Sequence, residues 1–169
     1  MEKMIEKTPQ QVTDRLNFWY LKYFGIGIEE VTGSEMFTIF DKLAKEKQNT
    51  IKGHFQLGNN ELCSLILWSE DGSFVLCTTH RFVHFSKSEI ESIKYSDFKC
   101  HDGFKSLRKP DRKENNVANI KVDGYYQDFG LRLKNGSIKY WKIPTGKFGY
   151  AFWNVTKKFE LIGRKYAIR

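Results

Sequence analysis

The sequence contains little cysteine and no long apolar run. Its 169 residues include three cysteines, an odd number without paired spacing, so we expect no disulfide framework and a reducing compartment. No apolar stretch approaches the roughly 18–20 residues that a membrane helix needs. The first residues, MEKMIEKTPQQ, lack the apolar core of a signal peptide. Together these absences predict a cytoplasmic protein.

Recognisable catalytic signatures are also missing. The sequence has no G-x-S-x-G, H-E-x-x-H or paired-carboxylate motif, and residues 145–147 lack the leading glycine and following hydroxyl of a phosphate loop. Cys77, His80 and His84 resemble a metal-ligand spacing, but they straddle a predicted hairpin turn and no second pair follows. We therefore expect no enzyme, no metal site and no cofactor.

The composition is that of a folded domain with an uneven charge. Hydrophobic residues make up 40% and aromatic residues 15%, which argues against intrinsic disorder. The formal charge is +8; residues 1–60 are neutral, so residues 61–169 carry all of it. Residues 130–169 hold ten basic side chains against Glu160 alone. Such a surface either attracts an anionic partner or only keeps the protein soluble.

Two helices are predicted in the first fifty residues. Thr8 and Gln11 form a capping box around Pro9, and Gly25 can end that helix. A second capping box, Thr32 to Glu35, precedes apolar residues at helical spacing, and we expect this helix to fray near residue 49. The apolar residues of the second helix would be Met36, Ile39, Phe40 and Leu43.

The pattern changes to short strands after residue 51. Asp71-Gly72 and Asn135-Gly136 are typical of tight hairpin turns, because these pairs tolerate positive φ. The polar stretch 102–118 predicts a loop. The predicted strands are residues 62–68, 74–77, 81–85, 90–95, 119–122, 129–133 and 138–143.

A last amphipathic helix is predicted from residue 146. Its inner face consists of Phe148, Ala151, Phe152, Val155, Phe159 and Ile162. The opposite side carries a second stripe, Tyr150, Trp153, Lys157 and Leu161. A helix with aromatic residues on both faces needs cover on both. We expect the N-terminal helices to cover the outer stripe; a partner is the alternative.

Four segments of the sequence resemble the bacterial pleckstrin-homology-like (PH-like) and GRAM-like families. They are ELCSLILW, GSFVLCTTHRFVHFS, IESIKYSDF and FGLRLKNGSIKYWKIP, together with the order of about seven strands and one C-terminal helix. Leu76, Thr78, Arg81, Phe82 and Phe85 match the second element of these families, and Ile93, Tyr95 and Phe98 the third. The resemblance covers about residues 61–162.

The resemblance implies an α+β fold: a bent antiparallel sheet or partly open barrel, capped by the C-terminal helix. The two helices predicted from the capping boxes precede it as an extension packed on this domain. The expected units are residues 1–50, a linker at 51–60, and the PH-like domain at 61–169. Family members that bind phosphoinositides use basic residues in the loop between the first two strands. Here that loop contains Glu70 and Asp71, which would repel phosphate.

The resemblance and the missing catalytic motifs predict a non-enzymatic binding module, most simply for a protein partner. The alternatives are an electrostatic binder of an anionic surface, either lipid headgroups or nucleic acid, and an enzyme with an unrecognised site. Aromatic side chains would anchor the partner and basic ones would orient it. The candidate binding residues are Lys105, Arg108, Lys109, Arg112 and Lys113 in the basic loop, and Tyr150, Trp153 and Lys157 on the outer stripe.

Overall fold

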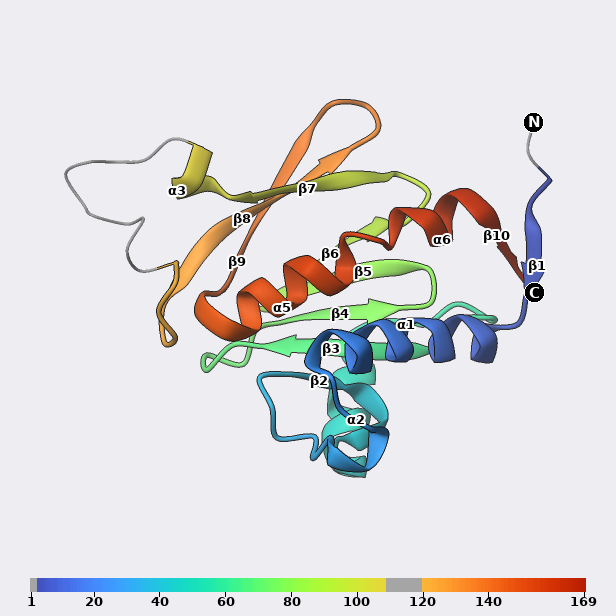
Figure 1. Ribbon diagram of the computed structural model, residues 1–169, viewed down its shortest axis with the longest axis horizontal. Coiled ribbons are helices and arrows are strands. Elements are labelled where there is room, and N and C mark those ends of the chain that lie inside the picture. The colour runs from blue at the N-terminus through green and yellow to red at the C-terminus, as the bar shows by residue number, and fades with distance from the viewer. Residues whose placement is uncertain (1–2, 109–119) are drawn as a thin grey trace.

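The computed structural model describes residues 3–108 and 120–169 of the chain. These residues form a mixed α+β fold with three sheets (Figure 1). The strands are β1 (Ile5–Lys7), β2 (Phe37–Ile39), β3 (Cys63–Trp68), β4 (Phe74–Thr78), β5 (Arg81–Ser86), β6 (Glu89–Lys94), β7 (Phe98–Phe104), β8 (Tyr126–Leu133), β9 (Ile138–Pro144) and β10 (Tyr166–Ile168). The helices are α1 (Pro9–Phe24), α2 (Lys45–Lys52), α3 (Lys105–Arg108), α5 (Gly146–Thr156) and α6 (Glu160–Lys165), with short 3-10 turns at Ile28–Glu30 and Phe40–Lys42.

The sheets differ in size and direction. The largest is antiparallel, in the order β2-β3-β4-β5-β6, and the second is the antiparallel β7-β8-β9. The smallest pairs β1 with β10 in parallel and so joins the two ends of the described chain. The described strands number ten instead of about seven, and they form no closed barrel. The α+β class and the C-terminal helix are confirmed, whereas the PH-like assignment stays an expectation.

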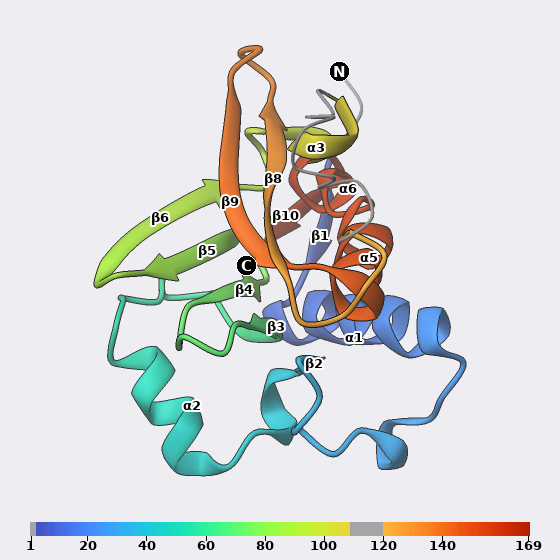
Figure 2. The same ribbon diagram turned by 90° about the vertical axis from the view of Figure 1, so that its left-hand side faces the viewer.

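The part of the five-stranded sheet around β3 and β4 is covered on both faces (Figures 1 and 2). On one face α1 and α5 pack into the main core, where Phe152 contacts Phe37 of β2, Phe82 of β5 and Phe129 of β8. On the other face the segment from Phe40 to α2 covers a smaller cluster. This explains why β3 and β4 are nearly continuous apolar runs, since both of their faces are buried.

The first predicted helix is confirmed. Thr8 Oγ1 accepts a hydrogen bond from the Gln11 backbone N–H, and the Gln11 side chain accepts one from the Thr8 N–H. Gly25 ends the helix in the left-handed region, with φ of 66°. The helix buries its apolar stripe under β3 and α5, and so the local capping signal and the tertiary packing agree.

The second predicted helix is wrong. Glu35 does accept a hydrogen bond from the Thr32 N–H, but no helix follows. Residues 37–39 instead form β2, which pairs with Leu65–Leu67 of β3, and α2 begins only at Lys45. Pairing at the sheet edge buries Phe37 and Ile39 completely and so outweighs the local helical spacing.

Three other expectations are also corrected. Residues 120–122 lie in turns instead of a strand, and residue 119 lies outside the described residues. Part of the predicted loop 102–118 belongs to β7 and α3. The last helix is interrupted at residues 157–159 and continues as α6. The domain boundaries at 51–60 stay a prediction; the structure places β2, from the first fifty residues, directly in the five-stranded sheet.

Tyr150 and Trp153 of the outer stripe are covered by the second sheet and not by the N-terminal helices. Trp153 packs against Phe104 of β7 and Phe129 of β8, and its ring fills the space beside Gly103. A Cβ atom at Gly103 would lie 2.3 Å from that ring. The expectation that the N-terminal helices cover Trp153 is wrong, because β7 and β8 pack across this side of α5. Helix α1 packs on the neighbouring side, where its Trp19 stacks on Phe159.

Candidate functional site

A cleft of about 910 Å³ opens beside the turn between β4 and β5. Segments distant in sequence line it: the loop 56–61, the β4–β5 turn, the end of β6, and the α6–β10 region. Its apolar lining consists of Met4, Leu57, Ile162, Tyr166 and Ile168. Its polar lining includes His80, Arg81 and Lys94. The cleft therefore combines apolar side chains with many basic and hydrogen-bonding groups.

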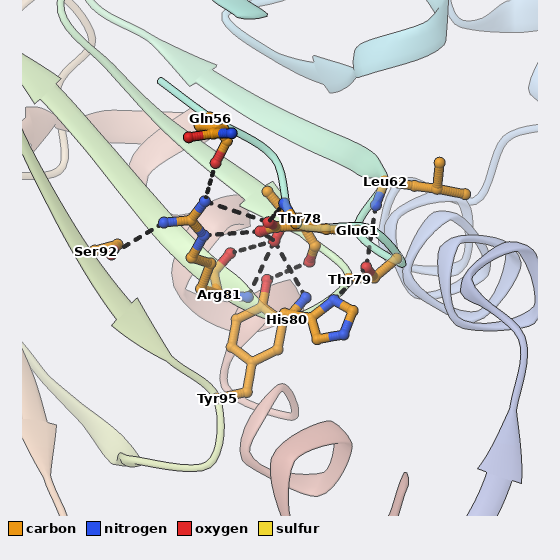
Figure 3. Close-up of polar contacts among 10 residues, drawn as sticks. Gln56, Glu61, Leu62, Thr78, Thr79, His80, Arg81, Ser92 and Tyr95 are labelled. Carbon is orange, nitrogen blue, oxygen red and sulfur yellow. Dashed lines mark hydrogen bonds and ion pairs between the residues drawn. The ribbon is translucent and has the colours of Figure 1, made fainter. Parts of the chain in front are cut away.

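An ion pair between Glu61 and Arg81 organises the polar side of the cleft (Figure 3). Arg81 Nε donates to Glu61 Oε1 at 2.8 Å, and Nη2 donates to Glu61 Oε2 at 3.2 Å. Nη2 also donates to the Gln56 carbonyl at 2.7 Å, which ties the loop 56–61 to β5. The Arg81 side chain is 22% exposed and that of Glu61 is 6% exposed. The guanidinium thus holds one side of the cleft in place.

Glu61 is buried as a carboxylate because donors surround it. Thr78 Oγ1 donates to Oε1 at 2.6 Å, and the Gly58 N–H donates to Oε2 at 2.8 Å. Burial alone raises the pKa of Glu61, but the hydrogen bonds from Arg81, Gly58 and Thr78 outweigh it and leave the pKa below its ordinary value. At neutral pH Glu61 is therefore ionised, and both of its carboxylate oxygens accept hydrogen bonds.

Thr78 also shapes the two-residue turn that presents His80. Its hydroxyl accepts hydrogen bonds from the backbone N–H groups of His80 and Arg81, at 3.1 Å each. Its carbonyl accepts one from the buried hydroxyl of Tyr95 at 2.7 Å. The turn is therefore fixed from both sides, by the ion pair and by Tyr95 (Figure 3).

His80 lines the cleft as a neutral ring. Thr79 Oγ1 accepts the Leu62 N–H at 3.2 Å and lies 2.8 Å from His80 Nδ1. Burial, together with Arg81, lowers the pKa of His80 and outweighs the opposing effect of Glu61, so the ring is neutral at pH 7. The Thr79 hydroxyl and Nδ1 share one hydrogen bond in which either group can donate. The neutral ring adds a hydrogen-bonding group to the cleft.

The basic loop predicted from the sequence is only partly described. Lys109, Arg112 and Lys113 lie outside the described residues. Arg108 is the last residue of α3. Lys105 begins α3, and its Nζ lies 5.0 Å from the centre of the Tyr140 ring. These residues stay a prediction.

The structure separates the three residues predicted on the outer stripe. Tyr150 and Trp153 stack on each other with ring centroids 6.1 Å apart and are half-buried against the second sheet. Burial raises the pKa of the Tyr150 hydroxyl. Lys157 is exposed and lies on the other side, beside α1. None of the three lines the 910 Å³ cleft.

The Glu61–Arg81 cluster was not identified from the sequence. Glu61 lies 20 residues before Arg81, and neither belongs to a motif with known chemistry. One signal was present: Thr78 and Arg81 bracket a two-residue turn between apolar strands, where a buried hydroxyl and an arginine need partners.

Comparisons with known proteins give no match: no family model, no curated protein and no solved structure is similar to this chain. Among residues 3–108 and 120–169, no group of three or more His, Cys, Asp or Glu side chains could hold a metal ion. None of the helices in this part of the chain is long and apolar enough to span a bilayer.

Proposed function

We propose that this chain is a non-enzymatic binding module, that its partner is another protein, and that the Arg81 cleft receives a segment of that partner. The observation that carries the proposal is the cleft itself. Its volume of about 910 Å³ lies at the upper end of the range of roughly 300–1,000 Å³ typical of ligand sites. Its lining combines apolar side chains, which a partner segment can bury, with basic and hydrogen-bonding groups that can fix its orientation.

Pre-organisation of the polar groups supports a binding role. Arg81 is already engaged by Glu61 and by the Gln56 carbonyl, so its position does not depend on a ligand. A rigid site loses less conformational entropy when a partner binds. His80 supplies a neutral hydrogen-bonding ring, and Lys94 supplies an exposed positive charge at the end of β6. A partner segment with apolar side chains and a backbone or carboxylate acceptor fits these groups.

The test compares two lysines that are both exposed on strands. Lys94 lines the cleft, whereas Lys99 on β7 does not. Lys94→Trp and Lys99→Trp remove the same charge and add the same ring, but only the first narrows the cleft. We purify the proteins that wild type and Lys99→Trp capture and that Lys94→Trp does not. The affinity of each for the three chains is then measured by calorimetric titration. We expect Lys94→Trp to weaken the complex by about tenfold or more and Lys99→Trp by less than about twofold.

Two results would overturn the proposal. The first is that every captured partner binds Lys94→Trp as tightly as wild type, while circular dichroism shows both variants folded. The second is turnover of a compound by the purified chain that Lys94→Trp abolishes, because the cleft would then be an active site.

A further inference from the structure

A second, smaller hollow lies between α1 and α5, which run side by side on one face of the molecule (Figure 1). Its volume is about 260 Å³. It is lined by Trp19, Lys22 and Tyr23 of α1 and by Asn154, Val155, Lys157 and Lys158 from α5 and the turn after it. We call it the α1–α5 pocket. The Arg81 cleft is lined by none of these residues.

The aromatic part of the pocket is held in place by the core. Trp19 stacks on the buried ring of Phe159 with centroids 5.9 Å apart, so its indole is a fixed, half-buried wall. Tyr23 is 44% exposed and stands at the rim. On the α5 side, Asn154 Nδ2 donates to the Tyr150 carbonyl, which orients the amide. The pocket therefore exists before anything binds in it.

The charge around the pocket has one sign. Lys22, Lys157 and Lys158 are all exposed, and Nζ of Lys158 lies 5.9 Å from the centre of the Trp19 ring. None of the residues lining the pocket is a carboxylate. Glu160, the acidic residue nearest in sequence to the two lysines after α5, pairs with Arg164 on the next helical turn. Three exposed lysines and no carboxylate thus line a hollow whose apolar part is formed by Trp19, Tyr23 and Val155.

We infer that the α1–α5 pocket binds an acidic segment of a protein, with one apolar side chain inserted against Trp19 and flanking carboxylates facing the lysines. The inference adopts a protein partner from the proposed function but uses a separate surface. A hollow of about 260 Å³ is smaller than typical small-molecule sites and suits a single side chain. A lipid bilayer is instead bound by apolar side chains that protrude, whereas Trp19 lies in the wall of a hollow.

The probes are three synthetic peptides with blocked ends: EEFEE, EEAEE and KKFKK. Binding is followed by the chemical shift of the Trp19 indole N–H in the full chain. We expect EEFEE to shift this signal, EEAEE to bind about fivefold more weakly because it lacks the ring, and KKFKK not to bind. Higher salt should weaken EEFEE binding, since the lysines are exposed and screened.

Matched variants assign the effect to the pocket. Lys157→Gln with Lys158→Gln removes two charges beside Trp19, and Lys134→Gln with Lys139→Gln removes two exposed charges around the β8–β9 hairpin. The first pair should weaken EEFEE binding by about fivefold, and the second should leave it within about twofold. Vesicles containing phosphatidylserine and a single-stranded oligonucleotide are tested with the same chains.

The inference is overturned if EEFEE and EEAEE bind equally, because binding would then need no inserted side chain. It is also overturned if the Lys157/Lys158 variant binds EEFEE as tightly as wild type. A third contrary result is that EEFEE binds neither the wild-type protein nor this variant, while the variant loses the binding of vesicles or oligonucleotide that wild type shows. Failure here and failure of the proposed function are distinguishable, because Lys94→Trp leaves the α1–α5 pocket intact and these variants leave the cleft intact.

Discussion

The two concave regions of this protein treat charge in opposite ways. In the Arg81 cleft the carboxylate of Glu61 is buried and every one of its oxygens is engaged by a donor. In the α1–α5 pocket, Lys22, Lys157 and Lys158 are exposed and face no carboxylate in the pocket lining. A buried charge has to be paired to be tolerated, so it fixes structure. An exposed unpaired charge costs little and stays available to a partner.

The largest expected effect follows from breaking the buried pair. Arg81→Met leaves Glu61 buried without its cation, and we expect the free energy of unfolding at pH 7.5 to fall by about 3 kcal/mol. Urea unfolding measures this loss. The double variant Glu61→Gln with Arg81→Met keeps the Thr78 hydrogen bond without a charge, and it should recover at least about 1 kcal/mol. If Arg81→Met lowers the free energy of unfolding by less than about 1 kcal/mol, the Glu61–Arg81 ion pair does not stabilise the cleft.

His101 is a third case, a titratable group buried without a charged partner. Its Nε2 lies 2.7 Å from Thr156 Oγ1, whose own proton goes to the Phe152 carbonyl. Nδ1 is therefore the unprotonated nitrogen, and it has no hydrogen-bond partner. Burial lowers the pKa of His101 to about 3 from its ordinary 6.5. The aromatic rings packed around it are Phe82, Phe98, Phe129 and Phe152.

This depressed pKa predicts an acid-sensitive core. Below pH 6.5 the unfolded chain binds a proton at His101 that the folded chain does not. The contribution of His101 to the free energy of unfolding is therefore fully present above pH 6.5 and is lost as the pH falls toward 3. Between pH 7.5 and 5 we expect a loss of about 2 kcal/mol from this group. His101→Leu should reduce the pH dependence by that amount, as measured by urea unfolding at both pH values. An unchanged pH dependence in His101→Leu would contradict the assignment.

The smallest effect is expected at the exposed lysines. Replacing Lys157 and Lys158 by Gln should change the free energy of unfolding by less than about 0.5 kcal/mol, because the side chains are solvated and unpaired with carboxylates in the pocket. Thermal unfolding of this variant beside Lys134→Gln with Lys139→Gln provides the measurement. A loss above about 1 kcal/mol would mean that these lysines stabilise the fold, and the contrast with Arg81 would disappear.

The two capping boxes show where sequence reasoning works and where it stops. Thr8 and Gln11 cap α1, because the apolar stripe that follows has β3 and α5 to pack on. At Thr32 only one of the two capping-box bonds forms, from the Thr32 N–H to the Glu35 side chain, and Glu35 also accepts from the Thr38 hydroxyl. The chain after Glu35 nevertheless becomes β2, since an edge of the sheet is available to Phe37 and Ile39. The spacing of apolar residues in the sequence does not reveal which helix or strand they will pack against.

The candidate site was less predictable than the fold. The β3–β4 and β8–β9 hairpins were predicted, because Asp71-Gly72 and Asn135-Gly136 carry their turn geometry in the local sequence; Gly72 and Gly136 have φ of 87° and 90°. The Arg81 cleft needs Glu61, the β4–β5 turn and the α6–β10 region to meet, and no local pattern encodes that meeting. Lys157 was predicted as a binding residue, but its pocket neighbours Trp19 and Lys22 come from the other end of the chain.

By itself, the sequence determined the α+β class, the first helix with its cap, both Gly-containing hairpins and the amphipathic C-terminal helix, because each depends on φ/ψ preferences and hydrophobic spacing within a few residues. Only the tertiary structure decided that residues 37–39 become a strand, that β7 and β8 cover Trp153, and that Glu61 meets Arg81. These outcomes depend on which buried surfaces and charges find each other across the chain. That choice is made by the free energy of the whole fold and not by any one segment.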